Sequence, residues 1–304
     1  MSGAASGRPD RRVGMSTRAA FLGLGTMGVP MARRLTAALD GSVAVWNRTA
    51  AKTAEVPDAR PAATPAEAAR DVDVIVTMVA DGAALDALLE GPDGLLAGAR
   101  AGSVLVDMST IGPAAARAVA ARCAEADVRF LDAPVSGSVP AATDGSLIAM
   151  VGGSAAALEQ ARPALAAMTR AQLHLGDHGA GAAMKLALNL QLAVVNQAIA
   201  ETLVLAERSG IARADAYEVI ASGALGAPYV HYKRAAFADP QQAPVAFAVD
   251  LMRKDVRLAL SMAGDAGVEL PAGAAAAVAL ERLAEAGLGA QDVSSALLGI
   301  VAPD

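Results

Sequence analysis

The stretch Ala19-Ala-Phe-Leu-Gly-Leu-Gly-Thr-Met-Gly28 decides the fold of this 304-residue chain. Its apolar start predicts a short buried strand, and the pattern G-x-G-x-x-G then leads into a predicted helix that ends near Leu39. In that context Gly23 permits a tight turn, Gly25 lets the backbone approach a pyrophosphate, and Gly28 allows close packing of the helix on the strand. The free N–H groups at the helix start favour phosphate. We therefore predict a dinucleotide site formed by Gly23, Leu24, Gly25, Thr26, Met27 and Gly28.

The second predicted strand, residues 42–46, is followed by Asn47-Arg48-Thr49. At this distance from the glycines, a cofactor without a 2′-phosphate usually meets an Asp or Glu. Here the chain has an amide, a guanidinium and a hydroxyl instead. Arg48 can bind a phosphate with two parallel hydrogen bonds and stack on adenine. We therefore predict NADP(H) as the cofactor, with Asn47, Arg48 and Thr49 among its contacts; the alternative is a solvated arginine at a strand end.

Strands and Ala-rich helices alternate through the first half of the chain. Further strands are expected at residues 73–79, 102–107, 128–131, 147–151 and 171–175, helices at 113–126 and 155–168, and a tight turn at Asp144-Gly145. This alternation predicts an α/β fold with a Rossmann-type, doubly wound, mostly parallel sheet that binds ligands at the carboxyl ends of its strands. The candidate residues at those ends are Val79, Ala80, Thr110, Ser136, Gly137 and Ser138. Ser136 and Gly137 offer a hydroxyl and an unhindered N–H to a small carboxylate, although a plain turn would have the same residues.

A second stretch, Gly179-Ala-Gly-Ala-Ala-Met-Lys-Leu-Ala-Leu-Asn189, opens a long apolar segment that ends near Arg208. No proline interrupts residues 180–208, and Ala, Leu, Glu and Gln dominate, so we predict one interdomain helix about 45 Å long. Because this helix is apolar nearly all round, we expect it to be buried between other elements. One polar stripe breaks the pattern, and its members are Gly181, Lys185, Asn189 and Asn196.

Lys185 is the member of this stripe with the clearest chemical meaning. A lysine on a buried helix needs a partner or a task. Asn189, one turn later, can hold a substrate oxygen beside the ammonium, and Gly181, one turn earlier, leaves room for a bound molecule. The alternative is a lysine whose stem packs while its head reaches water. Lys254 presents a similar choice, since it can reach across an interdomain cleft or carry a surface charge.

The rest of the chain is expected to be all-helical. The predicted helices span residues 213–222, 229–237, 247–266, 271–286 and 292–300. We therefore predict three parts: a disordered tail (1–16), an NADP-binding Rossmann domain (17–178) and an all-helical domain (179–304). Five side chains of the helical domain can either line a substrate pocket or pack in its core; they are Tyr217, Tyr229, His231, Tyr232 and Phe237.

Composition and charge exclude several classes of protein. A net charge of −6 and a pI near 5.2 argue against nucleic acid as a partner. The apolar stretch 186–206 contains five Asn, Gln or Glu residues, which a membrane span would not tolerate. The single cysteine, Cys123, suits a reducing, cytoplasmic environment. His174 and His178 straddle a strand end without further ligands, so we predict no metal site.

Four blocks of the sequence, in this order, resemble the β-hydroxyacid dehydrogenase family. The blocks are Phe21-Leu-Gly-Leu-Gly-Thr-Met-Gly-Val-Pro-Met-Ala32, Asp132-Ala-Pro-Val-Ser-Gly137, the stretch from Gly179 to Asn189, and Lys254-Asp255. The resemblance covers about residues 19–300. The family includes 3-hydroxyisobutyrate dehydrogenase, glyoxylate/succinic semialdehyde reductases and, more distantly, 6-phosphogluconate dehydrogenase. Residues 138–145 are most similar in motif to the glyoxylate/succinic semialdehyde branch.

The resemblance implies a role for each marked residue. Lys185 would be the catalytic acid/base and Asn189 would hold the substrate. Ser136 and Gly137, with Ser138 where the family has a second glycine, would bind a substrate carboxylate. Thr110 and Lys254 would lie near the nicotinamide half of the cofactor. The resemblance also implies a homodimer or larger assembly through the helical domain.

The function that follows is NADP(H)-dependent interconversion of a small β-hydroxyacid or hydroxy acid and its semialdehyde or keto form. Two alternatives stay open. Imine reductases share this layout, including Asn47-Arg48-Thr49, but typically have Asp or Tyr where Lys185 stands. A carbonyl oxygen gains negative charge as hydride arrives and suits an ammonium, whereas an iminium is already positive. The other alternative is an NADP(H)-binding module without catalysis.

Overall fold

The computed structural model describes residues 17–300; the predicted disordered tail, residues 1–16, lies outside them. The strands within that range are β1 (Ala19–Leu22), β2 (Val43–Trp46), β3 (Arg60–Pro61), β4 (Val74–Thr77), β5 (Val104–Asp107), β6 (Arg129–Asp132), β7 (Val135–Ser136), β8 (Leu147–Gly153) and β9 (Thr169–Gly176). They form one sheet in the order β3-β2-β1-β4-β5-β6-β8-β7, with β9 paired to β8. The neighbours from β3 to β6 are parallel, and β8 is antiparallel to β6 and β7. The mostly parallel sheet predicted from the sequence is confirmed.

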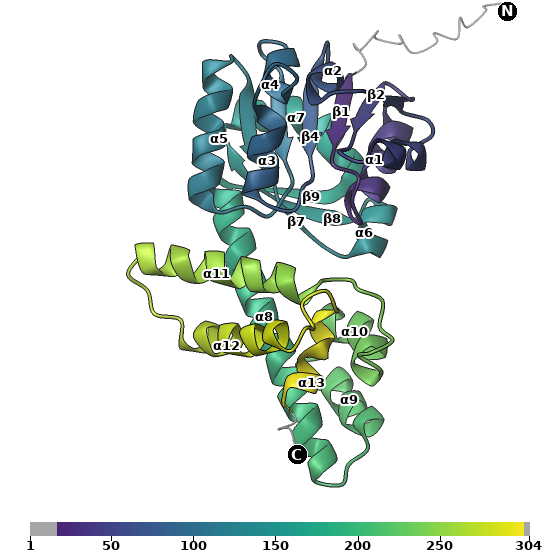
Figure 1. Cartoon of the computed structure of the whole chain (residues 1–304), viewed down its shortest axis with the longest axis vertical. Helices are drawn as coiled ribbons and strands as arrows, with labels where there is room; N and C mark the ends of the chain where they lie inside the picture. Colours follow the sequence, from purple (N-terminus) through teal and green to yellow (C-terminus); the bar gives the residue numbers. More distant parts are fainter. Residues whose placement is uncertain (1–16, 301–304) are drawn as a thin grey trace, which may run out of the picture.

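Helices cover both faces of this sheet. They are α1 (Gly28–Ala38), η1 (Ala50–Glu55), α2 (Pro65–Ala69), α3 (Gly82–Leu89), α4 (Leu95–Gly98), α5 (Pro113–Glu125), α6 (Val139–Asp144) and α7 (Ala155–Met168). One apolar core packs α1 and α7 on one face, and a second packs α2, α3 and α5 on the other (Figure 1). All four residues of β1, β4 and β5 are buried, as expected of strands covered on both faces. The carboxyl ends of the parallel strands therefore share one edge.

Helix α6 ends at Asp144-Gly145, where the sequence predicted a tight turn. It begins after Ser138, with a proline in its first turn, and ends at Gly145, whose φ of +71° is left-handed. A proline near the start and a left-handed glycine just past the end are helix boundary signals. The chain therefore turns at Gly145 as predicted, but the turn closes a short helix that the sequence pattern did not predict and that packs against α1.

The second half of the chain is helical. Its elements are α8 (Ala180–Arg208), α9 (Arg213–Ser222), α10 (Pro228–Ala238), α11 (Val249–Asp265), α12 (Pro271–Glu285), η2 (Val293–Ser295) and α13 (Ala296–Ile300). Helix α8 packs on β8, leaves the sheet and becomes the spine of the helical part, where α9, α11, α12 and α13 contact it (Figure 1). One long helix thus joins the two parts, with the bounds that the sequence predicted.

The prediction that α8 is buried between other elements holds for only part of its circumference. Leu186, Ile199 and Leu203 are buried, but Met184 and Leu205 are exposed. The helices packed on α8 cover only part of its circumference. Among the described residues α8 alone is long and apolar enough for a membrane span, which is weak evidence because the core helix of a soluble protein meets the same test.

Candidate active site

The three glycines after β1 have three different surroundings. Gly23 has a φ of +103°, and a Cβ there would lie 2.2 Å from the carbonyl oxygen of Met78. A Cβ on Gly28 would lie 1.9 Å from the carbonyl oxygen of Gly23, so this glycine lets α1 approach the loop. A Cβ on Gly25, in contrast, would meet no atom within 4 Å. The open space beside Gly25, at the N-terminus of α1, fits the pyrophosphate of a dinucleotide.

Asn47 shapes the glycine loop. Its Oδ1 accepts a hydrogen bond from the N–H of Leu24 (2.9 Å), and its Nδ2 donates to the carbonyl of Thr49 (3.1 Å). The side chain of Leu24 is buried in the core. The N–H of Leu24 is therefore not free for a phosphate, and Asn47 connects the ends of β1 and β2.

Arg48 is exposed just after β2. Since β1 and β2 are parallel neighbours, Arg48 lies at the same edge of the sheet as the glycine loop. Thr26 and Thr49 are also exposed there, and Met27 is half-buried where α1 begins. This edge combines a helix N-terminus, an open glycine and an arginine, a donor set that suits a phosphorylated cofactor.

A buried carboxylate that sequence reasoning missed organises the ends of β4 and β5. Asp107 Oδ1 accepts hydrogen bonds from the hydroxyls of Thr77 (2.8 Å) and Ser109 (2.6 Å). The hydroxyl oxygen of Ser109 in turn accepts the N–H of Val79 (2.9 Å). Burial raises the pKa of Asp107 to about 6, against the opposing effect of these hydrogen bonds. The network fixes Val79 and, beside it, the exposed Ala80.

Ser136 ends β7, and Gly137 and Ser138 connect it to α6. Gly137 has a φ of +138°, and a Cβ there would lie 2.6 Å from a methyl carbon of Leu147, so the position requires glycine. Ser138 stands at the start of α6 without capping it through its hydroxyl. Ser136 and Ser138 are half-buried and Gly137 is exposed. The geometry is compatible with the predicted carboxylate site, and the role itself stays a prediction.

The first turn of α8 is held by a carboxylate of β6. Asp132 accepts the N–H of Gly179 on Oδ1 and the N–H of Ala182 on Oδ2, both at 2.8 Å. Burial raises the pKa of Asp132, and these two hydrogen bonds act in the opposite direction. A Cβ on Gly181 would lie 2.2 Å from the carbonyl oxygen of Met150. The prediction that Gly181 leaves room for a bound molecule is therefore wrong, because the backbone of the sheet fills that space.

Lys185 and Asn189 lie on the next two turns of α8, where α11 packs on it. Asn189 Nδ2 donates to Oδ2 of Asp255 (2.6 Å), a residue of α11 that is buried. Burial lowers the pKa of the Lys185 ammonium to about 8; Asp255 acts to raise it and Lys254 to lower it. Lys185 is a half-buried residue whose ammonium is influenced by a neighbouring carboxylate and a second ammonium, so the packed stem and the altered ammonium distinguish it from a plain surface lysine.

Lys254 connects the helical part to the sheet. Its Nζ donates to the carbonyl oxygen of Thr110 (2.7 Å), beyond the end of β5, and lies 2.9 Å from Asp255 Oδ1. The side chain therefore reaches across to the strand ends. Asp255 is part of the Lys254-Asp255 motif, and the sequence pattern predicted no separate role for it. Asp255 shares the buried face of α11 with Met252, Val256 and Ala259, and a carboxylate at that helical spacing is the sequence signal that could have identified it.

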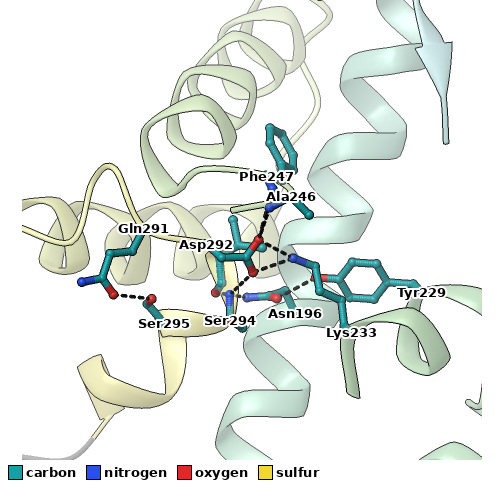
Figure 2. Close-up of polar contacts among 10 residues, drawn as sticks. Asn196, Tyr229, Lys233, Ala246, Phe247, Gln291, Asp292, Ser294 and Ser295 are labelled. Carbon is teal, nitrogen blue, oxygen red and sulfur yellow. Dashed lines mark hydrogen bonds and ion pairs between the residues drawn. The ribbon is translucent and has the colours of Figure 1, made fainter. Parts of the chain in front are cut away.

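Asn196, the last member of the polar stripe, belongs to a different cluster. Its Nδ2 donates to the carbonyl of Val293 (2.9 Å), and its Oδ1 accepts the hydroxyl of Tyr229 (2.7 Å) (Figure 2). Tyr217 and Phe237 are buried in the helical core, while Tyr232 is exposed. These aromatic residues stabilise the helical part. Of the polar stripe, Gly181 packs on the sheet, whereas Asn189 bonds to Asp255 of α11 and Lys185 is influenced by the charges of Asp255 and Lys254.

The two histidines near the end of β9 bond to backbone. His174 Nε2 lies 2.7 Å from the carbonyl oxygen of Gly153, and His178 Nε2 lies 3.1 Å from that of Phe130. Within residues 17–300 there is no group of three or more His, Cys, Asp or Glu side chains placed to hold a metal ion.

Known protein families match both parts of the chain. Residues 18–176 match the NAD-binding domain of 6-phosphogluconate dehydrogenase, and residues 179–299 match the NAD-binding domain of NADP-dependent 3-hydroxyisobutyrate dehydrogenase. The chain is 33% identical to 2-(hydroxymethyl)glutarate dehydrogenase of Eubacterium barkeri, over 93% of this chain and 94% of that protein. It is 34% identical to the chloroplastic glyoxylate/succinic semialdehyde reductase 2 of Arabidopsis thaliana, over 91% and 77%. It is 36% identical to 3-hydroxyisobutyrate dehydrogenase of Pseudomonas aeruginosa, over 86% and 90%.

Solved structures agree. The 3-hydroxyisobutyrate dehydrogenase of Mycobacterium tuberculosis, determined with L-serine, superposes with a TM-score of 0.83 at 32% identity, over 95% of this chain and 100% of that one. An imine reductase from Pseudomonas sp. shares the fold at a TM-score of 0.62 and 23% identity. The sheet, the long helix and the matches across both parts lead to one assignment. This chain belongs to the β-hydroxyacid dehydrogenase family of nicotinamide-dependent oxidoreductases.

Proposed function

We propose that the protein uses NADP(H) to interconvert a small hydroxy acid and its semialdehyde or keto form, with Lys185 as the acid/base. The observation that carries this proposal is the Lys185 ammonium, whose burial lowers its pKa to about 8 and whose helix also bears the Asn189–Asp255 contact. Groups with a pKa near the working pH are the best proton donors and acceptors. Relatives named for hydroxyacids and semialdehydes support the substrate class.

Lys185 would move one proton in each direction of the reaction. The bound cofactor supplies the hydride in reduction and accepts it in oxidation. In reduction the ammonium of Lys185 gives its proton to the carbonyl oxygen as negative charge develops there, leaving a neutral amine and a new O–H bond. In oxidation the neutral amine takes the hydroxyl proton. Burial lowers the pKa of Lys185 to about 8, with opposing effects from the charges of Asp255 and Lys254, so both forms are populated near pH 8.

The substrate would be held at both ends. Ser136, Gly137 and Ser138 provide hydroxyl and backbone N–H donors for its carboxylate. Asn189 gives one N–H to Asp255 and keeps its second N–H for the reacting oxygen, and its Oδ1 can accept the O–H of the hydroxy acid. Two fixed ends would present the carbonyl carbon in one orientation.

Gly25→Ala should weaken NADPH binding by about tenfold or more, or at least 1.4 kcal/mol, without a matching loss of stability. The new methyl group would extend into open space of the free protein but into the path of the pyrophosphate. Gly28→Ala should instead unfold the protein at lower urea, since its Cβ would meet the carbonyl of Gly23 at 1.9 Å. Fluorescence titration with NADPH measures binding, and urea unfolding measures stability. Equal losses of stability in the two variants would contradict the assignment of Gly25 to pyrophosphate binding.

Arg48→Ala should weaken NADPH binding by about 10- to 100-fold and leave NADH binding nearly unchanged. A charged hydrogen bond to phosphate contributes about 1.5–3 kcal/mol, and NADH lacks that phosphate. Arg60→Ala is the control, because Arg60 is an exposed arginine already paired with Glu67 at 3.2 Å. Binding of the two cofactors is measured in parallel by fluorescence titration. An equal loss for both would exclude Arg48 as the 2′-phosphate contact.

The function as a whole is tested by turnover on a panel of semialdehydes, glyoxylate and cyclic imines, with NADPH and NADH in parallel. Oxidation of NADPH by a carboxylate-bearing carbonyl supports the proposal. Turnover of cyclic imines alone would make the protein an imine reductase. Cofactor binding without turnover of any carbonyl or imine would make it a binding module.

We also propose a homodimer through the helical part. Met184, Val195 and Leu205 are exposed along α8, and exposed apolar side chains of this kind favour association. Light scattering combined with size-exclusion chromatography measures the mass.

A further inference from the structure

We propose that Asp132 is the positioning residue for Lys185: its carboxylate fixes the first turn of α8 and thereby the rotation and axial position of the helix that carries Lys185. The proposal rests on the proposed function, since it requires Lys185 to be the acid/base. Asp132 touches neither the substrate site nor Lys185 and acts through the helix.

Helix α8 has no side-chain cap of its own. It begins after Gly179, which has a φ of +93° and no side chain that could accept the free N–H groups of the first turn. The two oxygens of Asp132 supply what the glycine lacks, one to the N–H of Gly179 and one to that of Ala182. Two bonds to two positions of one turn set both the axial position and the rotation of the helix.

Asp132 is itself rigidly held. It is fully buried at the end of β6, and a Cβ on Gly152 of the adjacent strand would lie 2.6 Å from its Oδ1. The face of α8 next to it is equally close to the sheet, because a Cβ on Gly181 would lie 2.6 Å from the carbonyl oxygen of Asp132. Because the Asp132 carboxylate has so little room to move, the position of β6 determines the position of the first turn of α8.

Lys185 lies one helical turn after the residues that Asp132 holds. It is three residues after Ala182 and four after Gly181, so it lies on the same face of the helix one turn further on. One more turn leads to Asn189, which Asp255 holds from α11. Lys185 therefore lies between two carboxylate anchors with different effects. Asp255 acts on the charge of Lys185, whereas Asp132 is not among the groups that shift its pKa.

The test compares Asp132→Asn and Asp132→Ser with Ser154→Ala. Ser154 caps α7 through the N–H of Ala157 (3.2 Å), so its replacement removes a similar helix cap from an element that carries no site residue. The measured quantities are kcat per NADPH-binding site, the Kd for NADPH, the pH profile, and amide hydrogen exchange of residues 179–185.

We expect both Asp132 variants to lose about 10- to 100-fold in kcat per site, because a displacement of the order of 1 Å is enough for such a loss. NADPH affinity should stay within about twofold and the midpoint of the pH profile should not move, while the first turn of α8 exchanges faster. Ser154→Ala should keep its full kcat per site.

Unchanged kcat per site, or failure of both Asp132 variants to fold, would overturn the proposal and leave Asp132 a purely structural residue. A different variant tests the proposed function. If Lys185→Met retains turnover, Lys185 is not the acid/base whatever Asp132 does. If Lys185 is required and the Asp132 variants are fully active, only the positioning role is lost.

Discussion

Lys185→Met should lower kcat/KM by about 10²–10⁴-fold and leave the Kd for NADPH within about twofold of the wild-type value. Methionine keeps the apolar stem that packs along α8 but has no proton to give or take. Because burial rather than an ion pair dominates the environment of this ammonium, its loss should not destabilise the fold. Stopped-flow or steady-state turnover with the best substrate of the panel, together with a binding titration, measures both quantities.

The same lysine should give the two reaction directions opposite pH dependences. Reduction requires the ammonium, so its rate should fall as the pH rises through about 8, where Lys185 loses its proton. Oxidation requires the neutral amine, so its rate should rise through the same pH and then level off. The residual activity of Lys185→Met should show neither limb at this pH.

Lys52→Met is the matched control among the four lysines of the chain. Lys52 is exposed and pairs with Glu55 at 2.6 Å, far along the chain from α8 and α11. Its replacement should leave turnover and both pH limbs unchanged. Wild-type turnover by Lys185→Met with NADPH bound normally would refute the mechanism, whatever the substrate.

The fold follows closely from local patterns in the sequence. Short apolar runs separated by Ala-rich helices predicted the parallel sheet, because a strand covered on both faces needs apolar residues at every position. Each glycine of the loop after β1 also has the surroundings expected from the motif, with Gly23 and Gly28 crowded and Gly25 open. Local signals suffice here since turn geometry and helix packing depend on near neighbours.

Contacts between distant segments could not be predicted in this way. Asp107, Asp132 and Asp255 organise the candidate site, but their partners lie on other strands or helices, 30 to 66 residues away for Thr77, Ala182 and Asn189. Composition also could not show which side of α8 other helices cover. Gly181 illustrates the limit, because a glycine that leaves room does not reveal whether a ligand or a backbone uses that room.

Asp292→Ala should destabilise the helical part by about 3–5 kcal/mol, the usual effect of breaking a buried ion pair from one side. The Nζ of Lys233 lies 2.5 and 2.6 Å from the two oxygens of Asp292, and both side chains are buried (Figure 2). Burial lowers the pKa of Lys233, and Asp292 counteracts that effect. Alanine would leave the ammonium without its partner. Glu218→Ala, which breaks the exposed 2.8 Å pair with Arg234, is the control and should change stability by less than about 1 kcal/mol.

Lys233→Met should destabilise the protein less than Asp292→Ala, because the two partners of this pair do not have equal neighbours. Asp292 also accepts the N–H groups of Ala246 (3.0 Å), Phe247 (3.1 Å) and Ser294 (3.0 Å) (Figure 2). Those three bonds remain when the lysine is removed and are lost when the aspartate is removed, and each buried N–H left unpaired costs about 1–3 kcal/mol.

Urea unfolding followed by ellipticity reports the helices, whereas the fluorescence of Trp46, the single tryptophan, reports β2. The ellipticity transition should shift more than the Trp46 transition, and more for Asp292→Ala than for Lys233→Met. A larger loss of stability for Lys233→Met than for Asp292→Ala would mean that the ion pair, and not the backbone N–H groups bound by Asp292, stabilises this part of the molecule.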